Sequence, residues 1–208
     1  MLLYDVKSTK LLEKKLISTG HSEISLMMKA GNSVFNNFKN NKKVDIIILA
    51  GPGNNGGDAF ACAIQAHLNN FNVKCISLGN NIGHAKKVKD LAKILNITIM
   101  DKLPKKLVIK KSTIIIDGIL GIGISRKPED KILNAINWIN SIKNETVKIL
   151  SIDVPSGLDS TKGVSLGKSV IANTTIMFLT QKQGCYTGDG LKYCGKIIYE
   201  SLGIKNID

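Results

Sequence analysis

Val44-Asp-Ile-Ile-Ile-Leu-Ala50 is followed in this chain by Gly51-Pro-Gly-Asn-Asn-Gly-Gly-Asp58 and then by Ala59-Phe-Ala-Cys-Ala-Ile-Gln-Ala-His-Leu68. The pattern predicts a strand, a glycine-rich turn and a helix. The apolar run shows no alternation, which is typical of a strand that is covered on both faces. We expect the turn glycines to allow positive φ angles and close approach of a ligand to the backbone. We expect the Asp58 carboxylate to cap the helix that follows.

The spacing Gly51-x-Gly53-x-x-Gly56 matches the dinucleotide-binding fingerprint, which is a weak signal by itself. That fingerprint also needs an acidic residue about 20 positions later, at the end of the second strand, to hold a ribose. Here the second strand ends in Leu78-Gly-Asn-Asn81, which contains no acid. The sequence therefore disfavours NAD binding in the pose used for hydride transfer.

Along the rest of the chain, apolar runs typical of strands alternate with amphipathic segments typical of helices. We expect helices at residues 8–17 (with Ser8 as the N-cap), 22–38, 85–95 and 129–142, and strands at residues 72–77, 97–100, 112–117, 147–152, 174–179 and 196–199. This alternation predicts an α/β fold, a Rossmann-like three-layer αβα sandwich with a mainly parallel central sheet. We expect residues 1–208 to form a single domain.

Composition narrows the class of protein. The chain has 208 residues and is 43% hydrophobic, and none of its apolar runs approaches the roughly 18 residues of a membrane span. The N-terminal residues lack the apolar core and cleavage site of a signal peptide, so we expect a cytoplasmic protein without a membrane contact. Its four cysteines are scattered without a Cys-x-x-Cys pair, which disfavours a zinc site or a disulfide framework.

The formal net charge of +13 comes almost wholly from lysine, because Arg126 is the only arginine among 29 basic residues. Nucleic-acid readers favour arginine, whose planar fork makes bidentate contacts to bases. We therefore interpret the lysines mainly as a solvated surface and expect no specific binding of nucleic acid.

Polar and glycine-rich loops follow three of the expected strands, at residues 54–58, 117–125 and 153–156. An aspartate or serine after a strand can be a simple turn or cap residue. However, the carboxyl ends of parallel strands share one edge of a sheet, and ligands bind in the crevice there. We therefore expect the three loops to converge on one site.

The three loops also carry the motifs of a known family. Asn54-Asn-Gly-Gly-Asp58, Asp117-Gly-Ile-Leu-Gly-Ile-Gly123 and Asp153-Val-Pro-Ser-Gly157 resemble those of the NAD(P)HX epimerase family, the YjeF N-terminal domain. The resemblance extends over nearly the whole chain, because Leu26-Met-Met-Lys-Ala-Gly31 and Lys182-Gln-Gly184 also match. The chain departs from the family at Ala59, where a glycine is frequent.

The resemblance implies epimerisation of the R and S forms of hydrated NADH and NADPH (NADHX and NADPHX) at C6, a repair of nicotinamide nucleotides. It implies one potassium ion per subunit, held by Asn55, Asp117 and Ser156, which offer the oxygen ligands that a hard cation prefers. It also implies substrate contacts from the loop residues, namely Asn54, Asn55, Gly56, Gly57, Asp58, Gly121, Ile122, Gly123, Ile124, Ser125, Arg126, Lys127 and Asp153.

The chemistry of such a substrate requires an acid or base near the C6 hydroxyl. Protonation of that hydroxyl lets the ring nitrogen expel water and form a planar iminium, and ring opening to an aldehyde is the other route. Asp153 is our first candidate for the catalytic group because a rigid strand precedes it, and Asp58 is the second.

Two other functions remain open at this point. The same fold serves as a non-catalytic interaction module of the mRNA-decapping scaffold or apolipoprotein-binding type, and a glycine-rich loop alone would suit a generic nucleotide-binding protein. The intact site motifs favour the epimerase. We expect no fused dehydratase domain and a separate NAD(P)HX dehydratase as functional partner, and a homodimer is compatible with the resemblance.

Overall fold

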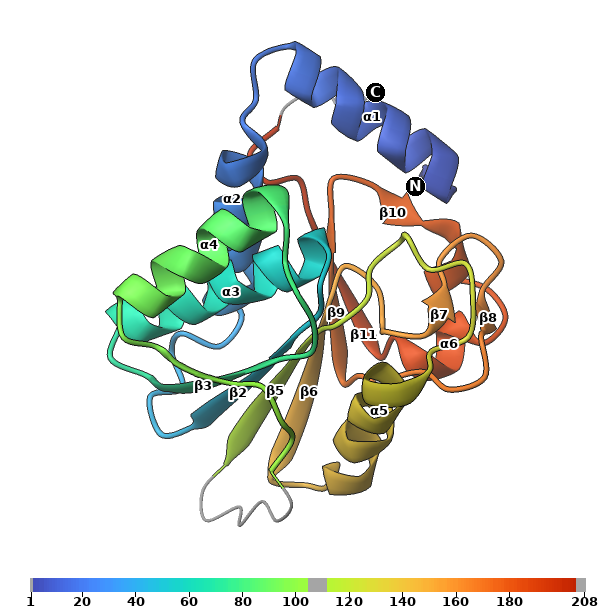
Figure 1. Ribbon diagram of the computed structural model, residues 1–208. Helices are drawn as coiled ribbons and strands as arrows, with labels where there is room; N and C mark the ends of the chain where they lie inside the picture. Colours follow the sequence, from blue (N-terminus) through green and yellow to red (C-terminus); the bar gives the residue numbers. More distant parts are fainter. Residues whose placement is uncertain (1, 105–111, 205–208) are drawn as a thin grey trace.

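A seven-stranded parallel sheet forms the centre of the molecule (Figure 1). The computed structural model describes residues 2–104 and 112–204. In spatial order, the sheet consists of β11 (Lys196–Glu200), β9 (Thr174–Phe178), β6 (Val147–Ile152), β5 (Thr113–Gly118), β2 (Asp45–Ala50), β3 (Asn72–Ser77) and β4 (Thr98–Met100). The expected strands are all present, and the sheet is parallel throughout.

Helices cover both faces of this sheet and thereby form the expected three-layer sandwich (Figure 1). One face is covered by α2 (Glu23–Asn36), α3 (Asn54–Leu68) and α4 (Gly83–Ile94), and the other by α5 (Asp130–Ile142). Helix α1 (Val6–Ser18) lies across the end of the molecule where the site loops meet. The short helices η1 (Gln183–Cys185) and α6 (Gly190–Tyr193) lie between β9 and β11 in the chain.

Strand β2 explains why the apolar run of the sequence does not alternate. Ile46, Ile48 and Ala50 pack into the hydrophobic cluster beneath α2, α3 and α4. Ile47 and Leu49 point the other way and pack into the cluster beneath α5. Because both faces of the strand are buried, every residue from Ile46 to Ala50 has to be apolar.

The glycines after β2 act through close packing rather than through positive φ. None of the four glycines between positions 51 and 57 has a positive φ, so that expectation was wrong. Helix α3 begins at Asn54 and contains Gly56 and Gly57 in its first turn. A Cβ atom on Gly56 would come within 1.9 Å of the Gly51 carbonyl oxygen, and one on Gly57 would come within 2.3 Å of the Met27 sulfur. The absence of side chains therefore lets α3 start directly against the strand.

Two of the expected helix caps are corrected by the structure. Asp58 lies in the second turn of α3, so it does not cap the helix; Gly53 occupies the N-cap position and has no side chain to donate or accept. At α1 the N-cap is Asp5, whose carboxylate accepts a hydrogen bond of 2.7 Å from the backbone amide of Ser8. The sequence reasoning placed this cap three residues too late because Ser8 also suits the position.

Two small strand pairs complete the fold and were not expected from the sequence. The parallel pair β1 (Leu3–Tyr4) and β10 (Gln181–Lys182) connects the N-terminus to the chain after β9, and the antiparallel pair β7 (Leu158–Asp159) and β8 (Val164–Ser165) follows β6. All four cysteines are buried and have free thiols. Within residues 2–104 and 112–204, no helix combines the length and the apolar character needed to cross a membrane.

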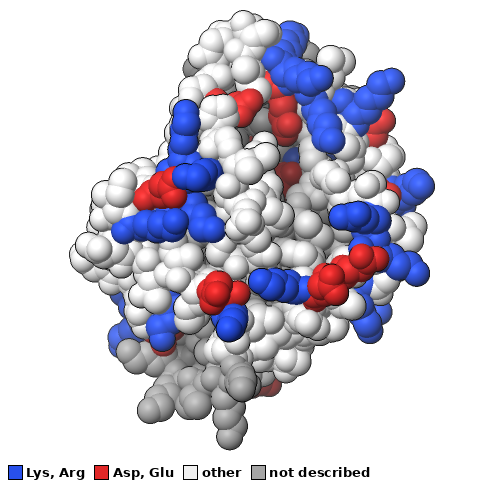
Figure 2. Space-filling model, viewed as in Figure 1, with Lys and Arg blue, Asp and Glu red and all other residues white. Residues whose placement is uncertain are grey.

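Charged side chains are interspersed on the face of the molecule seen in Figure 2. Lysine and arginine side chains are spread over this face with acidic side chains among them. Among the ion pairs of the described residues, Asp90 on α4 pairs with Lys86 and Lys93 of the same helix.

Candidate active site

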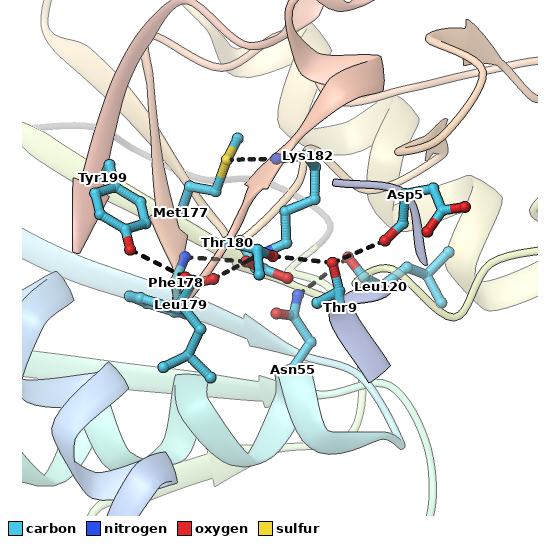
Figure 3. A network of polar contacts seen from close by, with 11 residues as sticks. Asp5, Thr9, Asn55, Leu120, Met177, Phe178, Leu179, Thr180, Lys182 and Tyr199 are labelled. Atoms are coloured by element: carbon cyan, nitrogen blue, oxygen red, sulfur yellow. Dashed lines mark hydrogen bonds and ion pairs between the residues drawn. The ribbon is translucent and has the colours of Figure 1, made fainter. Parts of the chain in front are cut away.

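The three polar loops meet at the carboxyl edge of the sheet, as the parallel arrangement predicted. The Asn55 side-chain amide donates a hydrogen bond of 3.0 Å to the Leu120 carbonyl oxygen (Figure 3). The Leu120 backbone amide in turn donates to the Ser156 hydroxyl at 2.8 Å. Residues from α3, from the loop after β5 and from the loop after β6 are thus linked directly.

Asp117, the penultimate residue of β5, lies beneath these loops in a sealed polar pocket. Its side chain is fully buried and accepts four hydrogen bonds. The donors are the hydroxyl groups of Ser151 and Ser156 and the backbone amides of Ser156 and Ile119. Burial raises the pKa of Asp117, and these hydrogen bonds oppose the rise.

The chain leaves β6 and β9 through two turns of the same unusual kind. Asp153 has a φ of 64°, and the Val154 amide donates to the Ile152 carbonyl oxygen at 2.7 Å. Leu179 has a φ of 61°, and the Thr180 amide donates to the Phe178 carbonyl oxygen at 2.6 Å. A three-residue turn around a non-glycine residue with positive φ is strained and needs support from its surroundings.

Lys182 supplies that support to both turns. Its side chain is 1% exposed, and its ammonium group forms an ion pair with Asp153 Oδ1. The same ammonium group donates to the Phe178 carbonyl oxygen at 2.7 Å (Figure 3). Asp153 Oδ1 also accepts a hydrogen bond of 3.1 Å from the Phe178 amide. The Lys182 ammonium and the Asp153 carboxylate therefore lock the exits of β6 and β9 together.

Two neighbouring cavities open at this edge of the sheet, and Asp153 lines both. The first has a volume of about 390 Å³ and lies between the loop after β2 and the loop after β5. The second, of about 330 Å³, extends toward α2 and has apolar walls from residues such as Met27 and Phe178. Lys10, Glu13, Asn54 and Asp58 also line both cavities.

The carboxyl groups in these cavities are electrostatically unusual. Desolvation raises the pKa of Asp58 well above its ordinary value, and the charges of Asp153 and Glu13 raise it further, against the opposing effect of Lys182. Burial likewise raises the pKa of Glu13, and the charge of Asp153 adds to that rise. Acidic groups that are crowded into one partly apolar cavity resist simultaneous ionisation, as in many catalytic sites.

The residues predicted to bind substrate divide into three sets. Asn54, Asn55, Asp58, Asp153 and residues 121–124 line the first cavity. Residues 123–127, which include Arg126 and Lys127, line an adjoining groove of about 750 Å³. Gly56 and Gly57 are buried and do not line these cavities; they shape the loops from behind. Asp117 and Ser156, which were predicted as metal ligands, are buried as well.

Sequence reasoning missed three charged residues of the site. In the sequence, Lys182 belongs to a motif near the end of the chain, and Lys10 and Glu13 lie in an amphipathic segment, whereas in the structure all three line the cavities. Only the docking of α1 across the sheet edge brings Lys10 and Glu13 to the cavities. Lys182 lies between Gln181 and Gln183, four residues after the last residue of the apolar strand β9, and this local sequence carries no distinctive signal.

Comparison with known proteins places the chain in a family. Residues 23–184 match the sequence profile described as YjeF-related protein N-terminus. The chain is 30% identical over 201 residues to an NAD(P)H-hydrate epimerase of Lentilactobacillus buchneri, an alignment that covers 95% of this chain and 92% of that protein. It is 32% identical to an NAD(P)H-hydrate epimerase of Limosilactobacillus reuteri, covering 74% of this chain and 71% of the relative.

A longer relative and a solved structure complete the comparison. The chain is 31% identical over 211 residues to a bifunctional NAD(P)H-hydrate repair enzyme of Coxiella burnetii, which covers 98% of this chain but only 42% of that protein. The crystal structure of the yeast protein ynu0 (YNL200c) has the same fold, with a TM-score of 0.78 at 20% identity, covering 96% of this chain and 87% of the yeast chain.

Proposed function

The chain belongs to the family of YjeF-related protein N-termini, and from this premise we propose that it is an isomerase, an NAD(P)H-hydrate epimerase. Its reaction would interconvert the R and S forms of NADHX and NADPHX at C6. Relatives that bear this name align with nearly the whole chain, and this agreement is the main support for the proposal.

The cavity that carries the proposal is the one shared by the loops after β2, β5 and β6. It combines carboxyl groups from Asp58 and Asp153 with the backbone of a glycine-rich loop at residues 121–124. The carboxyl groups suit proton transfer to and from a hydroxyl group. The adjoining groove, with exposed Arg126 and Lys127, suits the diphosphate of a dinucleotide.

The reaction needs proton transfer and support for a cationic intermediate. The ring nitrogen next to C6 can expel the protonated hydroxyl as water, and water that returns to the other face inverts the centre. The carboxylate of Asp153 would stabilise the iminium between these two events. We propose the residues of the first cavity and of the groove as the substrate contacts, and Asp153 as a catalytic group.

We further propose that a potassium ion binds beside Asp117. The residue types fit a hard cation: Asn55 Oδ1 accepts no hydrogen bond from the described residues, and the Ser156 hydroxyl donates its proton to Asp117 Oδ1 at 2.5 Å, which leaves its oxygen partly free. Asp117 would supply the negative charge, and the ion would supply positive charge that orders the loops. Thermal unfolding in potassium and in tetramethylammonium chloride at equal ionic strength tests this, because only potassium should raise the melting temperature.

The wider setting is proposed by analogy with the relatives. The chain spans about two fifths of the bifunctional repair enzyme of Coxiella burnetii, so the second activity implied by that name would come from another polypeptide segment. We propose an NAD(P)HX dehydratase as the functional partner, with the cytoplasm as the compartment and a homodimer as the assembly. Sedimentation of the purified protein tests the last point.

One measurement tests the activity directly. Purified protein is added to pure S-NADHX or pure R-NADHX, and the two epimers are followed by chromatography against a sample without protein. Acceleration to the same mixture from both sides supports the proposal. If neither epimer converts faster than it does spontaneously, the proposed function is wrong.

A further inference from the structure

Asp58, like Glu13, lines both cavities and makes no side-chain hydrogen bond within residues 2–104 and 112–204. It lies in the second turn of α3, half-buried, and its side chain has no hydrogen-bond or ion-pair partner among residues 2–104 and 112–204. It lines both cavities, and the second of these is walled by the apolar side chains of Leu26, Met27 and Phe178. An ionised carboxylate is costly in such a place unless it is paired.

Asp153 faces the same cavities in the opposite electrostatic situation. One of its oxygens, Oδ1, binds the buried ammonium of Lys182 and the backbone amide of Phe178. Its other oxygen, Oδ2, has no partner among the described residues, and the side chain is 14% exposed. Without this carboxylate the buried ammonium of Lys182 would lack an ion-pair partner among the described residues.

We propose that Asp58 enters the reaction as a neutral carboxylic acid and Asp153 as a carboxylate, so that Asp58 protonates the departing C6 hydroxyl and Asp153 accepts a proton from the returning water. This assignment rests on the proposed function. It adds a second catalytic residue to Asp153 and gives each carboxyl group a distinct role. Two titratable groups whose environments differ in this way are typical of acid and base pairs in enzymes.

The electrostatics of the cavity agree with this assignment. The raised pKa of Asp58 has desolvation as its largest cause and the charges of Asp153 and Glu13 as further causes. The charged groups that share the cavities with Asp58 are Lys10, Glu13, Lys14, Glu23, Asp153 and Lys182. Of these, Lys182 opposes the rise, but its ammonium is committed to Asp153.

The proposed steps balance in atoms and electrons. Asp58 gives its proton to the C6 hydroxyl, the C6–O bond breaks with its electron pair on the departing water, and the lone pair of the ring nitrogen forms the C=N bond. A water molecule then adds to the other face of C6, and the C=N electrons return to nitrogen. Asp153 Oδ2 takes the proton that this water releases.

One turnover therefore leaves Asp58 ionised and Asp153 protonated. That form is competent for the reverse conversion, in which the two residues exchange roles. A proton moving from Asp153 to Asp58 through solvent in the cavity restores the starting form and with it the ion pair between Asp153 and Lys182. Lys182 is thus a positioning residue that acts through Asp153.

Infrared spectroscopy tests the protonation state without reference to activity. The parent protein at neutral pH should show the carbonyl stretch of a protonated carboxylic acid. Asp58→Asn should remove that band, whereas Asp153→Asn and the surface control Asp90→Asn, on α4, should retain it. The absence of the band in the parent overturns the proposal, and so does a band that persists in Asp58→Asn or disappears in Glu13→Gln.

Kinetics test the catalytic role. With S-NADHX as substrate, Asp58→Asn should lower kcat by about 10²- to 10⁴-fold with little change in KM, because an asparagine has the shape of the acid but cannot deliver its proton. The parent kcat should fall as the pH rises through the raised pKa of Asp58, and the residual activity of Asp58→Asn should lack this fall. A folded Asp58→Asn variant with the parent kcat overturns the proposal.

These outcomes separate the inference from the function on which it rests. A parent protein that converts neither epimer refutes the epimerase itself, whatever the infrared spectra show. A parent that converts both epimers, together with an unimpaired Asp58→Asn, refutes only the acid role of Asp58. If Asp58→Asn does not fold, the spectra of the parent, Glu13→Gln and Asp117→Asn decide the protonation state, because the pKa values of Glu13 and Asp117 are also raised and the band of Asp58 should persist in both variants.

Discussion

Asp117 and Asp58 are two carboxyl groups at the same edge of the sheet, and their surroundings differ in almost every respect. Asp117 is fully buried and accepts hydrogen bonds from two serine hydroxyls and two backbone amides. Asp58 is half-buried, has no hydrogen-bond partner in the described part of the chain and faces open cavities. Desolvation raises the pKa of both groups, but only at Asp117 do hydrogen bonds counter it.

This difference separates a structural part of the site from a reactive part. A fully buried carboxylate that accepts four hydrogen bonds from the protein holds loops together and does not face the substrate cavities. A carboxyl group that the protein leaves unpaired, beside the locked ion pair of Asp153 and Lys182, is available for chemistry at a cost in stability. Substitutions in the two parts should therefore have different consequences.

The largest effect is expected in the reactive part, from Asp153→Asn. The substitution keeps the shape of the side chain but removes its capacity to accept and release a proton, so the epimerisation rate should fall by about 10²- to 10⁴-fold. NADHX equilibration by the variant is compared with that by Asp90→Asn, which changes an exposed aspartate on α4. A folded Asp153→Asn protein that works at the parent rate would exclude Asp153 from catalysis.

In the structural part of the site, Asp117→Ala should mainly lower the stability of the folded protein. It leaves the donors from Ser151, Ser156 and Ile119 without their acceptor, and the free energy of unfolding should fall by about 3–5 kcal/mol. Denaturation by urea measures this fall. Asp117→Asn, which retains an acceptor oxygen, should lose less; equal stability of Asp117→Ala and the parent would show that the network is not structural.

A pair of glycine substitutions sharpens the same contrast at the backbone. A Cβ at Gly56 would come within 1.9 Å of the Gly51 carbonyl oxygen, whereas a Cβ at Gly53, which lines the open cavity, would meet no atom within 4 Å. Gly56→Ala should therefore destabilise the protein by about 1–3 kcal/mol through overpacking. Gly53→Ala should change the unfolding free energy by no more than about 0.5 kcal/mol; the opposite ranking in thermal unfolding would contradict the packing argument.

The smallest effect concerns pH. Because the pKa of Asp58 is higher in the folded than in the unfolded protein, the folded state holds an extra proton between the ordinary and the raised value. This carboxyl therefore contributes a loss of stability as the pH rises through that window, by at most about 1.4 kcal/mol per pH unit. Asp58→Asn should lack this contribution. The unfolding free energy of the variant minus that of the parent should therefore increase as the pH rises; a difference that does not change with pH would contradict the assignment.

Much of the framework follows from local sequence patterns. Runs such as residues 44–50 and 147–152 are too apolar for any place except a strand that is buried on both faces, and the amphipathic segments between them predict helices. The rule that carboxyl ends of parallel strands share an edge then brings the loops with Asn55, Asp117 and Ser156 together. The contacts between Asn55 and Leu120 and between Leu120 and Ser156 agree with that reasoning.

Other features could not be read from neighbouring residues. The glycines at positions 56 and 57 looked like turn residues, and only the packing of α3 against Gly51 and Met27 explains them. A positive φ at Leu179 contradicts the local preference of leucine, and neither it nor the positive φ of Asp153 follows from neighbouring residues; Lys182 supports both turns by linking two strands.

The sequence by itself therefore determined the strands of the central sheet, the long helices and the edge at which the site forms, since these depend on the period of apolar residues and on backbone rules that act locally. Only the tertiary structure decided which charged groups share the cavity. Glu13 comes from the first helix, Asp58 from the third and Lys182 from beyond β9. Their protonation depends on burial and on one another's charges, and both are properties of the folded molecule that sequence spacing does not encode.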